Sequence, residues 1–71
     1  MTQIAFNQKY PQYEFLDTFM DFDIYMSEKD YRAFKISFDG KGNKQYESYI
    51  ANTSKEYIED YLTTTTNLEI R

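Results

Sequence analysis

The segment that decides the fold runs from Thr18 to Ser27 and reads TFMDFDIYMS. Its side chains alternate between two faces, which is typical of a β-strand with one buried face. The apolar face would carry Met20, Phe22, Ile24 and Met26. The opposite face would carry two carboxylates between two aromatic rings, namely Phe19, Asp21, Asp23 and Tyr25. We therefore predict one strand over about residues 18–26, with these last four side chains pointing the same way.

The acidic and aromatic face of this strand needs an explanation beyond exposure to water. A face that only meets water needs no Phe19 or Tyr25, and a face buried in a core needs no pair of aspartates. Aspartate is also disfavoured in strands, so its presence twice has a local cost. An interface that is part apolar and part anionic accounts for both features. We predict that this face lies in a contact with a partner protein or with a second copy of the chain.

The length and composition predict one small domain over residues 1–71. The chain has 71 residues, no cysteine and no histidine, which excludes disulfides and makes a structural zinc site implausible. Domains of this size usually need a disulfide, a metal or a partner for added stability. Eight tyrosines and six phenylalanines are more than so small a core can bury, and tyrosine is enriched at interfaces. These features favour association with another protein or with a second copy.

The charge of the chain is acidic and unevenly spread. The net charge is -4, and residues 14–30 hold six acidic side chains against one lysine. Residues 31–45 are basic, with Arg32, Lys35, Lys41 and Lys44 against Asp39. An acidic field repels nucleic acid and attracts basic protein surfaces. Solubility alone is the alternative explanation for a mildly acidic chain.

The segments before residue 18 are consistent with more than one structure. Ile4 and Phe6 would share a face in an extended chain, so a short strand is possible there. Pro11 is suited to the first position of a helix, and Tyr13 and Leu16 would then lie on one side of it. Residues 11–18 are therefore either a short helix or extended.

The middle of the chain predicts a hairpin. Ser27–Asp30, SEKD, is either a polar turn or a helix-capping box, and the alternation over residues 31–38 favours the turn. Residues 39–43, DGKGN, hold the only two glycines and are typical of a hairpin loop. We expect the returning strand over residues 44–51.

The end of the chain predicts an amphipathic helix followed by a short strand. Thr53 and Glu56 match a capping box, and an apolar stripe follows at Tyr57, Ile58, Tyr61 and Leu62. The β-branched run 63–66 should end the helix by Thr64, after which Leu68 and Ile70 alternate as in a strand. The predicted fold class is α+β, a small antiparallel three-stranded meander with one C-terminal amphipathic helix and short flanking elements.

The residue types needed for catalysis are scarce. Without histidine and cysteine the commonest bases and nucleophiles are missing, and none of the serines has an evident base. Asp21 and Asp23 are too few ligands for a metal site, and DGKGN matches no phosphate-binding pattern. We predict that the protein is not an enzyme and that it uses no cofactor and no metal.

Binding of single-stranded nucleic acid is a weaker alternative. The basic residues of 31–45 lie near Tyr31 and Tyr46, and such proteins combine cations with stacking rings. The overall charge has the wrong sign for this role. No apolar run is long enough to span a bilayer and no signal peptide is evident, so we expect a cytoplasmic protein.

In character the chain resembles small, acidic, tyrosine-rich inhibitors that phages encode against bacterial DNA-handling proteins. The likeness rests on Asp21 and Asp23 beside aromatic rings, on the tract QYESY at 45–49, and on acids along the exposed helix face. Inhibitors of uracil-DNA glycosylase and of the replicative sliding clamp belong to this class. The resemblance implies a DNA mimic that blocks a basic DNA-binding site on a replication or repair protein, in the host cytoplasm if the chain is phage-derived.

A narrower resemblance lies in residues 12–16, QYEFL, which are similar to the pentapeptide by which bacterial proteins dock on the sliding clamp. Gln12 and Glu14 match in kind, while Tyr13 departs from the pattern and Phe15-Leu16 reverses the usual order. The alternative, that Tyr13, Phe15 and Leu16 are core residues, is favoured.

Three acidic sets are therefore candidates for partner contact. The first is Asp21 with Asp23, flanked by Phe19 and Tyr25; the others are Glu14 with Asp17, and Glu56 with Glu59 and Asp60. We expect an inhibitor that binds a bacterial protein with a basic DNA-binding surface. The alternative is a homodimer or larger homo-oligomer, with a structural or regulatory role, whose aromatic face is its own interface.

Overall fold

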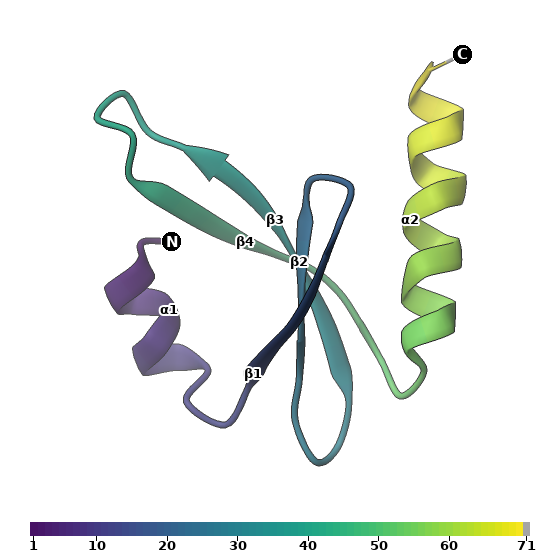
Figure 1. The fold of residues 1–71 in the computed structure, drawn as a ribbon, viewed down its shortest axis with the longest axis horizontal. Coiled ribbons are helices and arrows are strands. Elements are labelled where there is room, and N and C mark those ends of the chain that lie inside the picture. The colour runs from purple at the N-terminus through teal and green to yellow at the C-terminus, as the bar shows by residue number, and fades with distance from the viewer. Residues whose placement is uncertain (71) are drawn as a thin grey trace.

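The fold is α+β, with a four-stranded antiparallel sheet between two helices. The computed structural model describes the backbone of residues 1–70 and the side chains of residues 1–65. The elements in chain order are α1 (Gln3–Lys9), β1 (Glu14–Phe19), β2 (Phe22–Met26), β3 (Tyr31–Phe38), β4 (Lys44–Asn52) and α2 (Lys55–Ile70). The strands follow one another in the order β1-β2-β3-β4. The two helices lie on opposite sides of the sheet (Figure 1). The predicted class is confirmed, while the predicted count of three strands and one helix is wrong.

The predicted single strand over residues 18–26 is two strands joined by a tight turn. β1 ends at Phe19, β2 begins at Phe22, and these two residues pair with each other. Met20 between them has a φ of 58°, a left-handed conformation that L-residues seldom adopt. Because the turn has two residues, Phe19 and Phe22 point to the same face although they are three positions apart. The alternation expected for one continuous strand is therefore shifted by one position after the turn. Phe19 therefore faces α2, whereas Asp23 and Tyr25 face α1, and the prediction that they share a face is wrong.

The N-terminal segment is a helix and not a strand. The Ala5 N–H donates to the Thr2 hydroxyl oxygen at 3.2 Å, so Thr2 caps α1. Phe6 is the one buried residue of α1. The predicted alternative of a helix after Pro11 is also wrong, because residues 14–19 pair with β2 as an edge strand.

The predicted hairpins of the middle segment are confirmed. The Ser27 N–H donates to the Asp30 carbonyl at 2.8 Å across the β2–β3 turn. The Asp39 N–H donates to the Asn43 carbonyl at 2.9 Å, and Gly42 has a φ of 83°, which explains the glycine there. A β-bulge in β4 opposite Ala33 and Phe34 leaves Tyr49 as the extra residue.

The C-terminal helix is longer than predicted. α2 continues to Ile70, so the predicted end at Thr64 and the predicted strand at Leu68 and Ile70 are wrong. The Thr63 hydroxyl donates to the Glu59 carbonyl at 2.8 Å, which shows how a threonine is accommodated within this helix. The residue that caps α2 is Ser54 and not Thr53, because the Tyr57 N–H donates to the Ser54 hydroxyl oxygen at 3.2 Å.

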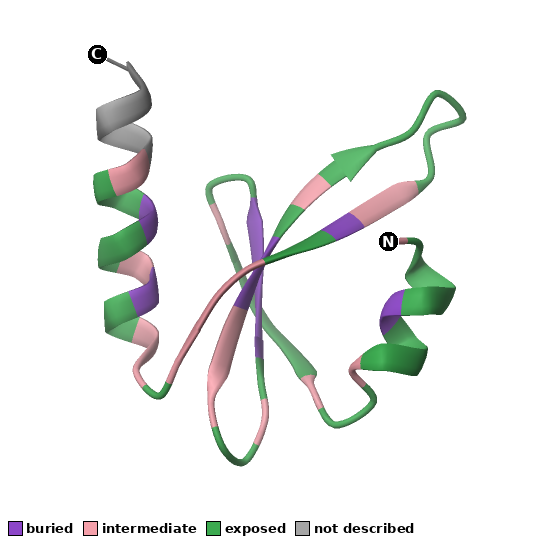
Figure 2. Ribbon diagram, turned by 180° about the vertical axis from the view of Figure 1, so that it is seen from behind, coloured by how far each residue is buried: buried purple, intermediate pink, exposed green. Residues whose placement is uncertain are grey.

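The sheet has an apolar cluster on each face, and each cluster is covered by one helix (Figure 2). On the α2 face, Phe22, Ile24 and Ala33 pack with Ile58 and Leu62 of the helix. On the α1 face the cluster is aromatic and consists of Phe6, Tyr25, Phe34 and Tyr46. Burial on both faces explains why four consecutive residues of β2, Phe22 to Tyr25, are buried, and why so many rings are needed.

Candidate partner-binding surface around α2

Asp23, the central acid of the predicted interface, is buried within the domain. Only 2% of its surface is exposed, and the Lys44 ammonium lies 2.7 Å from Oδ2. The Thr18 hydroxyl donates to Oδ1 at 3.0 Å. The hydrogen bond to Asp23 raises the pKa of Lys44 above its usual value. The carboxylate is thus paired and hydrogen-bonded, which is what a buried charge requires, and its role is structural.

The two rings predicted beside Asp23 also belong to the domain's own cores. Tyr25 packs against Phe6 and Phe34 on the α1 face, and burial raises the pKa of its hydroxyl. Phe19 is half-buried against the α2-face cluster. Of the four residues predicted to form one contact face, only Asp21, in the turn after β1, is exposed.

Members of the other two predicted acidic sets, Asp17 and Glu59, meet at Lys55 on one flank of α2. The Lys55 ammonium lies 3.7 Å from the Asp17 carboxylate of β1 and 3.7 Å from the Glu59 carboxylate of α2. Glu14 lies on the same strand as Asp17, and Glu56 follows Lys55 at the start of the helix. We call Glu14 and Asp17 of β1 together with Lys55, Glu56 and Glu59 of α2 the acidic flank.

The opposite flank of α2 carries tyrosines. Tyr57 and Tyr61 are 50% and 41% exposed, and their rings stack at 6.5 Å with an interplanar angle of 20°. Tyr61 meets Tyr49 of the β4 bulge edge-on at 5.9 Å. Asp60 follows Tyr57 by three residues and is its neighbour on the helix surface. Tyr49, Tyr57 and Tyr61 form the tyrosine flank.

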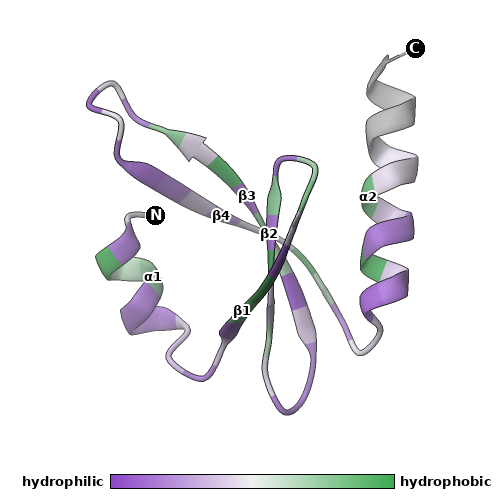
Figure 3. Cartoon of the chain, viewed as in Figure 1, coloured by the Kyte–Doolittle hydropathy of each residue, from purple (hydrophilic) through white to green (hydrophobic). Residues whose placement is uncertain are grey.

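The two flanks lie on either side of the residues that attach α2 to the sheet. Ile58 and Leu62 are fully buried, and Figure 3 shows the hydrophobic positions of α2 toward the sheet and its hydrophilic ones away from it. The sequence missed the separate role of Tyr57 and Tyr61, which it placed in the buried stripe. Their angular offset from the line of Ile58 and Leu62 is the signal that distinguishes them.

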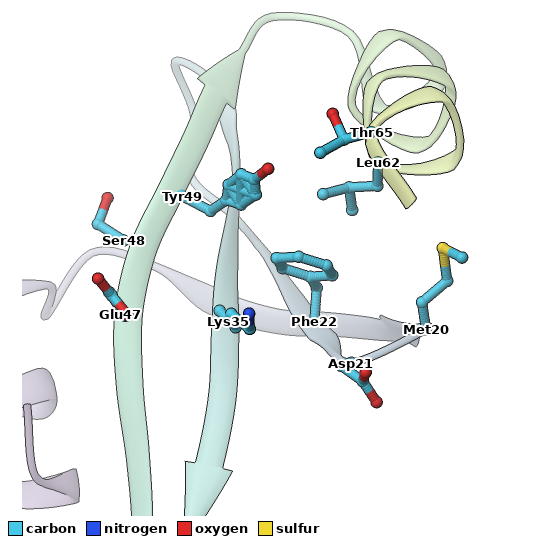
Figure 4. Close-up of a pocket in the computed structure, with 9 residues that line it drawn as sticks. All are labelled: Met20, Asp21, Phe22, Lys35, Glu47, Ser48, Tyr49, Leu62 and Thr65. Carbon is cyan, nitrogen blue, oxygen red and sulfur yellow. The ribbon is translucent and has the colours of Figure 1, made fainter. Parts of the chain in front are cut away.

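A hollow lies between α2, the β1–β2 turn and the middle of β3 and β4 (Figure 4). Its volume is about 350 Å³. Its lining joins apolar groups with three charged side chains, and the residues are Met20, Asp21, Phe22, Lys35, Glu47, Ser48, Tyr49, Leu62 and Thr65. The Phe22 and Tyr49 rings lie 4.8 Å apart. Lys35 and Glu47 are register partners on β3 and β4, and yet no ion pair joins them to each other, to Asp21 or to another side chain of residues 1–65.

Residues 12–16 form the start of the edge strand. The Tyr13 hydroxyl donates to the Asp30 carboxylate, so Tyr13 is held within the domain. Phe15 and Leu16 are 57% and 37% exposed, so the interpretation of these two as core residues is wrong. The register shift between Phe15 and Asp17 makes Leu16 the bulged residue of β1.

The basic residues of 31–45 do not gather on one face. The Arg32 guanidinium lies 5.4 Å from the Tyr10 ring centre and 5.7 Å from that of Tyr13, on the α1 face. Lys35 lines the hollow on the other face, and Lys44 is paired with Asp23. Arg32 and Lys44 therefore lie beside rings of the α1 face, and the sheet separates Lys35 from them.

Comparison with known proteins gives no match from which a function could be inferred. No protein-family model matches the chain, and neither the curated proteins nor the solved structures include a significant match. Among the described residues, no helix is long and apolar enough to cross a membrane, and no three histidine, cysteine or acidic side chains are grouped as metal ligands would be.

Proposed function

We propose that this protein is an inhibitor that binds another protein through α2 and mimics DNA there. Its target would be a bacterial replication or repair protein with a basic DNA-binding surface, such as the sliding clamp. The observation that carries the proposal is the composition of the α2 surface, which has the acidic flank on one side of the helix and the tyrosine flank on the other. The surface differs from the one predicted at residues 19–25, but its chemistry is the same.

The charges of this surface favour a basic target. Lys55 is the one cation within the acidic flank, and it pairs with Asp17 and Glu59. The other two carboxylates of the flank therefore have no ion-pair partner among the described side chains. The pKa of Glu56 is lowered by hydrogen bonds from its own backbone N–H and from the Ser54 hydroxyl. Carboxylates three and four residues apart on a helix lie about 5–6 Å apart at their Cβ atoms. Such a row can approximate the spacing of charges along a nucleic-acid backbone.

The tyrosine flank supplies the apolar part of the contact. Tyrosine buries a large ring at a small cost in side-chain entropy and keeps a hydroxyl for hydrogen bonds, which is why interfaces are rich in it. The Tyr57 and Tyr61 rings are already stacked on each other in the free chain. They therefore lose little freedom when a partner covers them.

The test is capture of targets from bacterial lysate on the immobilised protein, followed by competition of the captured protein against duplex DNA. We expect E56Q/E59Q/D60N to slow association at least about tenfold at low salt, because steering depends on charge. The matched control is Glu28→Gln, an exposed acid in the β2–β3 turn, with no more than about a twofold effect. Unchanged association of the triple variant, or a captured protein whose DNA binding is unaffected, would refute the proposal.

A second candidate is a homodimer with a structural or regulatory role. It is favoured by Phe15 and Leu16, two adjacent apolar side chains exposed on β1, which is an edge strand of the sheet. Edge strands with exposed apolar residues tend to associate. The two candidates use different surfaces, so both can hold in one protein.

A further inference from the structure

We propose that the hollow beside α2 receives an arginine side chain of the partner. The inference rests on the proposed function, since it assigns a specific contact to the same surface. The hollow adjoins the tyrosine flank through Tyr49, which meets Tyr61 on one side and Phe22 on the other. A partner that covers Tyr57 and Tyr61 is therefore brought next to the opening.

The size and the walls of the hollow suit one long side chain. A volume of about 350 Å³ is at the lower end for small-molecule pockets, which hold roughly 300–1,000 Å³. Met20, Phe22 and Leu62 supply apolar wall for the methylene stem, as Figure 4 shows. Tyr49 supplies a ring on which a planar guanidinium can stack.

The charges at the opening select a cation. Asp21 comes from the β1–β2 turn and Glu47 from β4, and neither forms an ion pair with the described side chains. A guanidinium can bond a carboxylate through two parallel N–H groups, a geometry that an ammonium lacks. Among the described side chains of α2, those in the lining are neutral, Leu62 and Thr65. The recognition of charge therefore depends on the turn and on β4.

Lys35 provides a test of the charge of the occupant. It is the one cation among the described residues of the lining and comes from β3, between the two carboxylates. Its ammonium competes with an incoming guanidinium, so Lys35→Met should strengthen binding of arginine. An anionic ligand would need Lys35 and would lose its binding in the same variant. A single substitution thus separates a cationic from an anionic occupant.

The experiment is an NMR titration of the isotopically labelled full chain with the blocked tripeptide Ac-Ala-Arg-Ala-NH₂. We expect shifts of the backbone amides of Phe22, Tyr49 and Leu62. Asp21→Asn and Glu47→Gln should each weaken binding about two- to fivefold, and Lys35→Met should tighten it by a similar factor. Glu28→Gln is the matched control and should leave the affinity unchanged.

Three results would overturn the inference. One is the absence of shifts at the hollow, and another is equal binding of peptides with leucine or lysine in place of arginine. The third is binding of a peptide with glutamate in place of arginine, if Lys35→Met abolishes that binding. Binding of the captured target by variants of the two surfaces distinguishes a failure of this inference from a failure of the proposed function. If E56Q/E59Q/D60N loses the target while D21N/E47Q keeps it at full affinity, the arginine contact is wrong and the inhibitor function stands.

Discussion

At the scale of single residues, Asp23 shows how a side chain can look functional in the sequence and be structural in the fold. Two aspartates in an apolar strand have a cost that needs an explanation. The explanation for Asp23 is Lys44, which is 21 residues away along the chain and 2.7 Å away in space. No spacing rule connects the two positions, so the sequence indicated that Asp23 needs a partner without identifying it.

The ion pair predicts an asymmetry between its two members. Lys44→Met leaves a buried carboxylate with only the Thr18 hydroxyl, and should cost about 3 kcal/mol of unfolding free energy. Asp23→Asn should cost only about 1 kcal/mol, because Lys44 is partly exposed and can turn to water. Urea unfolding measures both, with Lys41→Met as an exposed control within about 0.5 kcal/mol of the parent. A larger loss for Asp23→Asn would contradict the assignment.

Two raised pKa values predict that the fold is sensitive to alkali. Burial raises the pKa of Tyr25, and the hydrogen bond to Asp23 raises that of Lys44. A raised value means that the folded state holds its proton longer than the unfolded state, so the stabilisation is complete below about pH 10 and is lost as the pH rises further. Circular dichroism between pH 8 and pH 12 should show this fall. Tyr25→Phe should make it shallower, whereas Tyr57→Phe, at an exposed ring, should not.

At the scale of elements, the hairpins and the existence of α2 could be predicted because their signals are local. The glycines of DGKGN and the polar SEKD mark turns whatever surrounds them. The β1–β2 turn has no such marker, since Met20 takes a left-handed conformation without a glycine. Tertiary packing of Phe19 and Phe22 on α2 determines that turn, which explains why the alternation was interpreted as one strand.

The start of α2 gives a prediction that separates two adjacent residues. Ser54 accepts a hydrogen bond from the Tyr57 N–H, while Thr53, which the sequence favoured as the cap, is exposed before the helix. Ser54→Ala should therefore lower the unfolding free energy by about 1 kcal/mol, and Thr53→Ala should change it by less than about 0.5 kcal/mol. Thermal unfolding of the two variants measures the difference. Equal losses would show that the cap is shared.

At the scale of the whole molecule, the sheet buries rings on both faces, and this changes the interpretation of the composition. The aromatic excess indicated an interface, yet Phe6, Tyr25, Phe34 and Tyr46 fill a second core under α1. The sequence did not reveal this core because α1 was expected to be a strand. The chemistry of the candidate surface was predictable, since the acids of α2 were chosen from its pattern. Its location was not, because it depends on which flank of α2 meets β1 and which meets β4.

The open edge at β1 predicts how the chain associates. Substituting Phe15 and Leu16 with serine should leave the stability within about 0.5 kcal/mol of the parent, because neither side chain is buried. If the edge forms a dimer, sedimentation should show a dimer for the parent and a monomer for the double variant. A parent chain that stays monomeric up to millimolar concentration would exclude the homodimer.

The meander order of the sheet has a kinetic consequence. Each strand pairs with its neighbour in the chain, so every hairpin closes only a short loop, and such topologies fold quickly. The exception is α1, which meets β4 through contacts such as the Tyr46 hydroxyl to the Gln3 side-chain oxygen, 43 residues apart. We infer that the hairpins and α2 assemble first and that α1 docks last. The nascent chain would then expose its second aromatic core until β4 has emerged, although the helix that covers this core is made first.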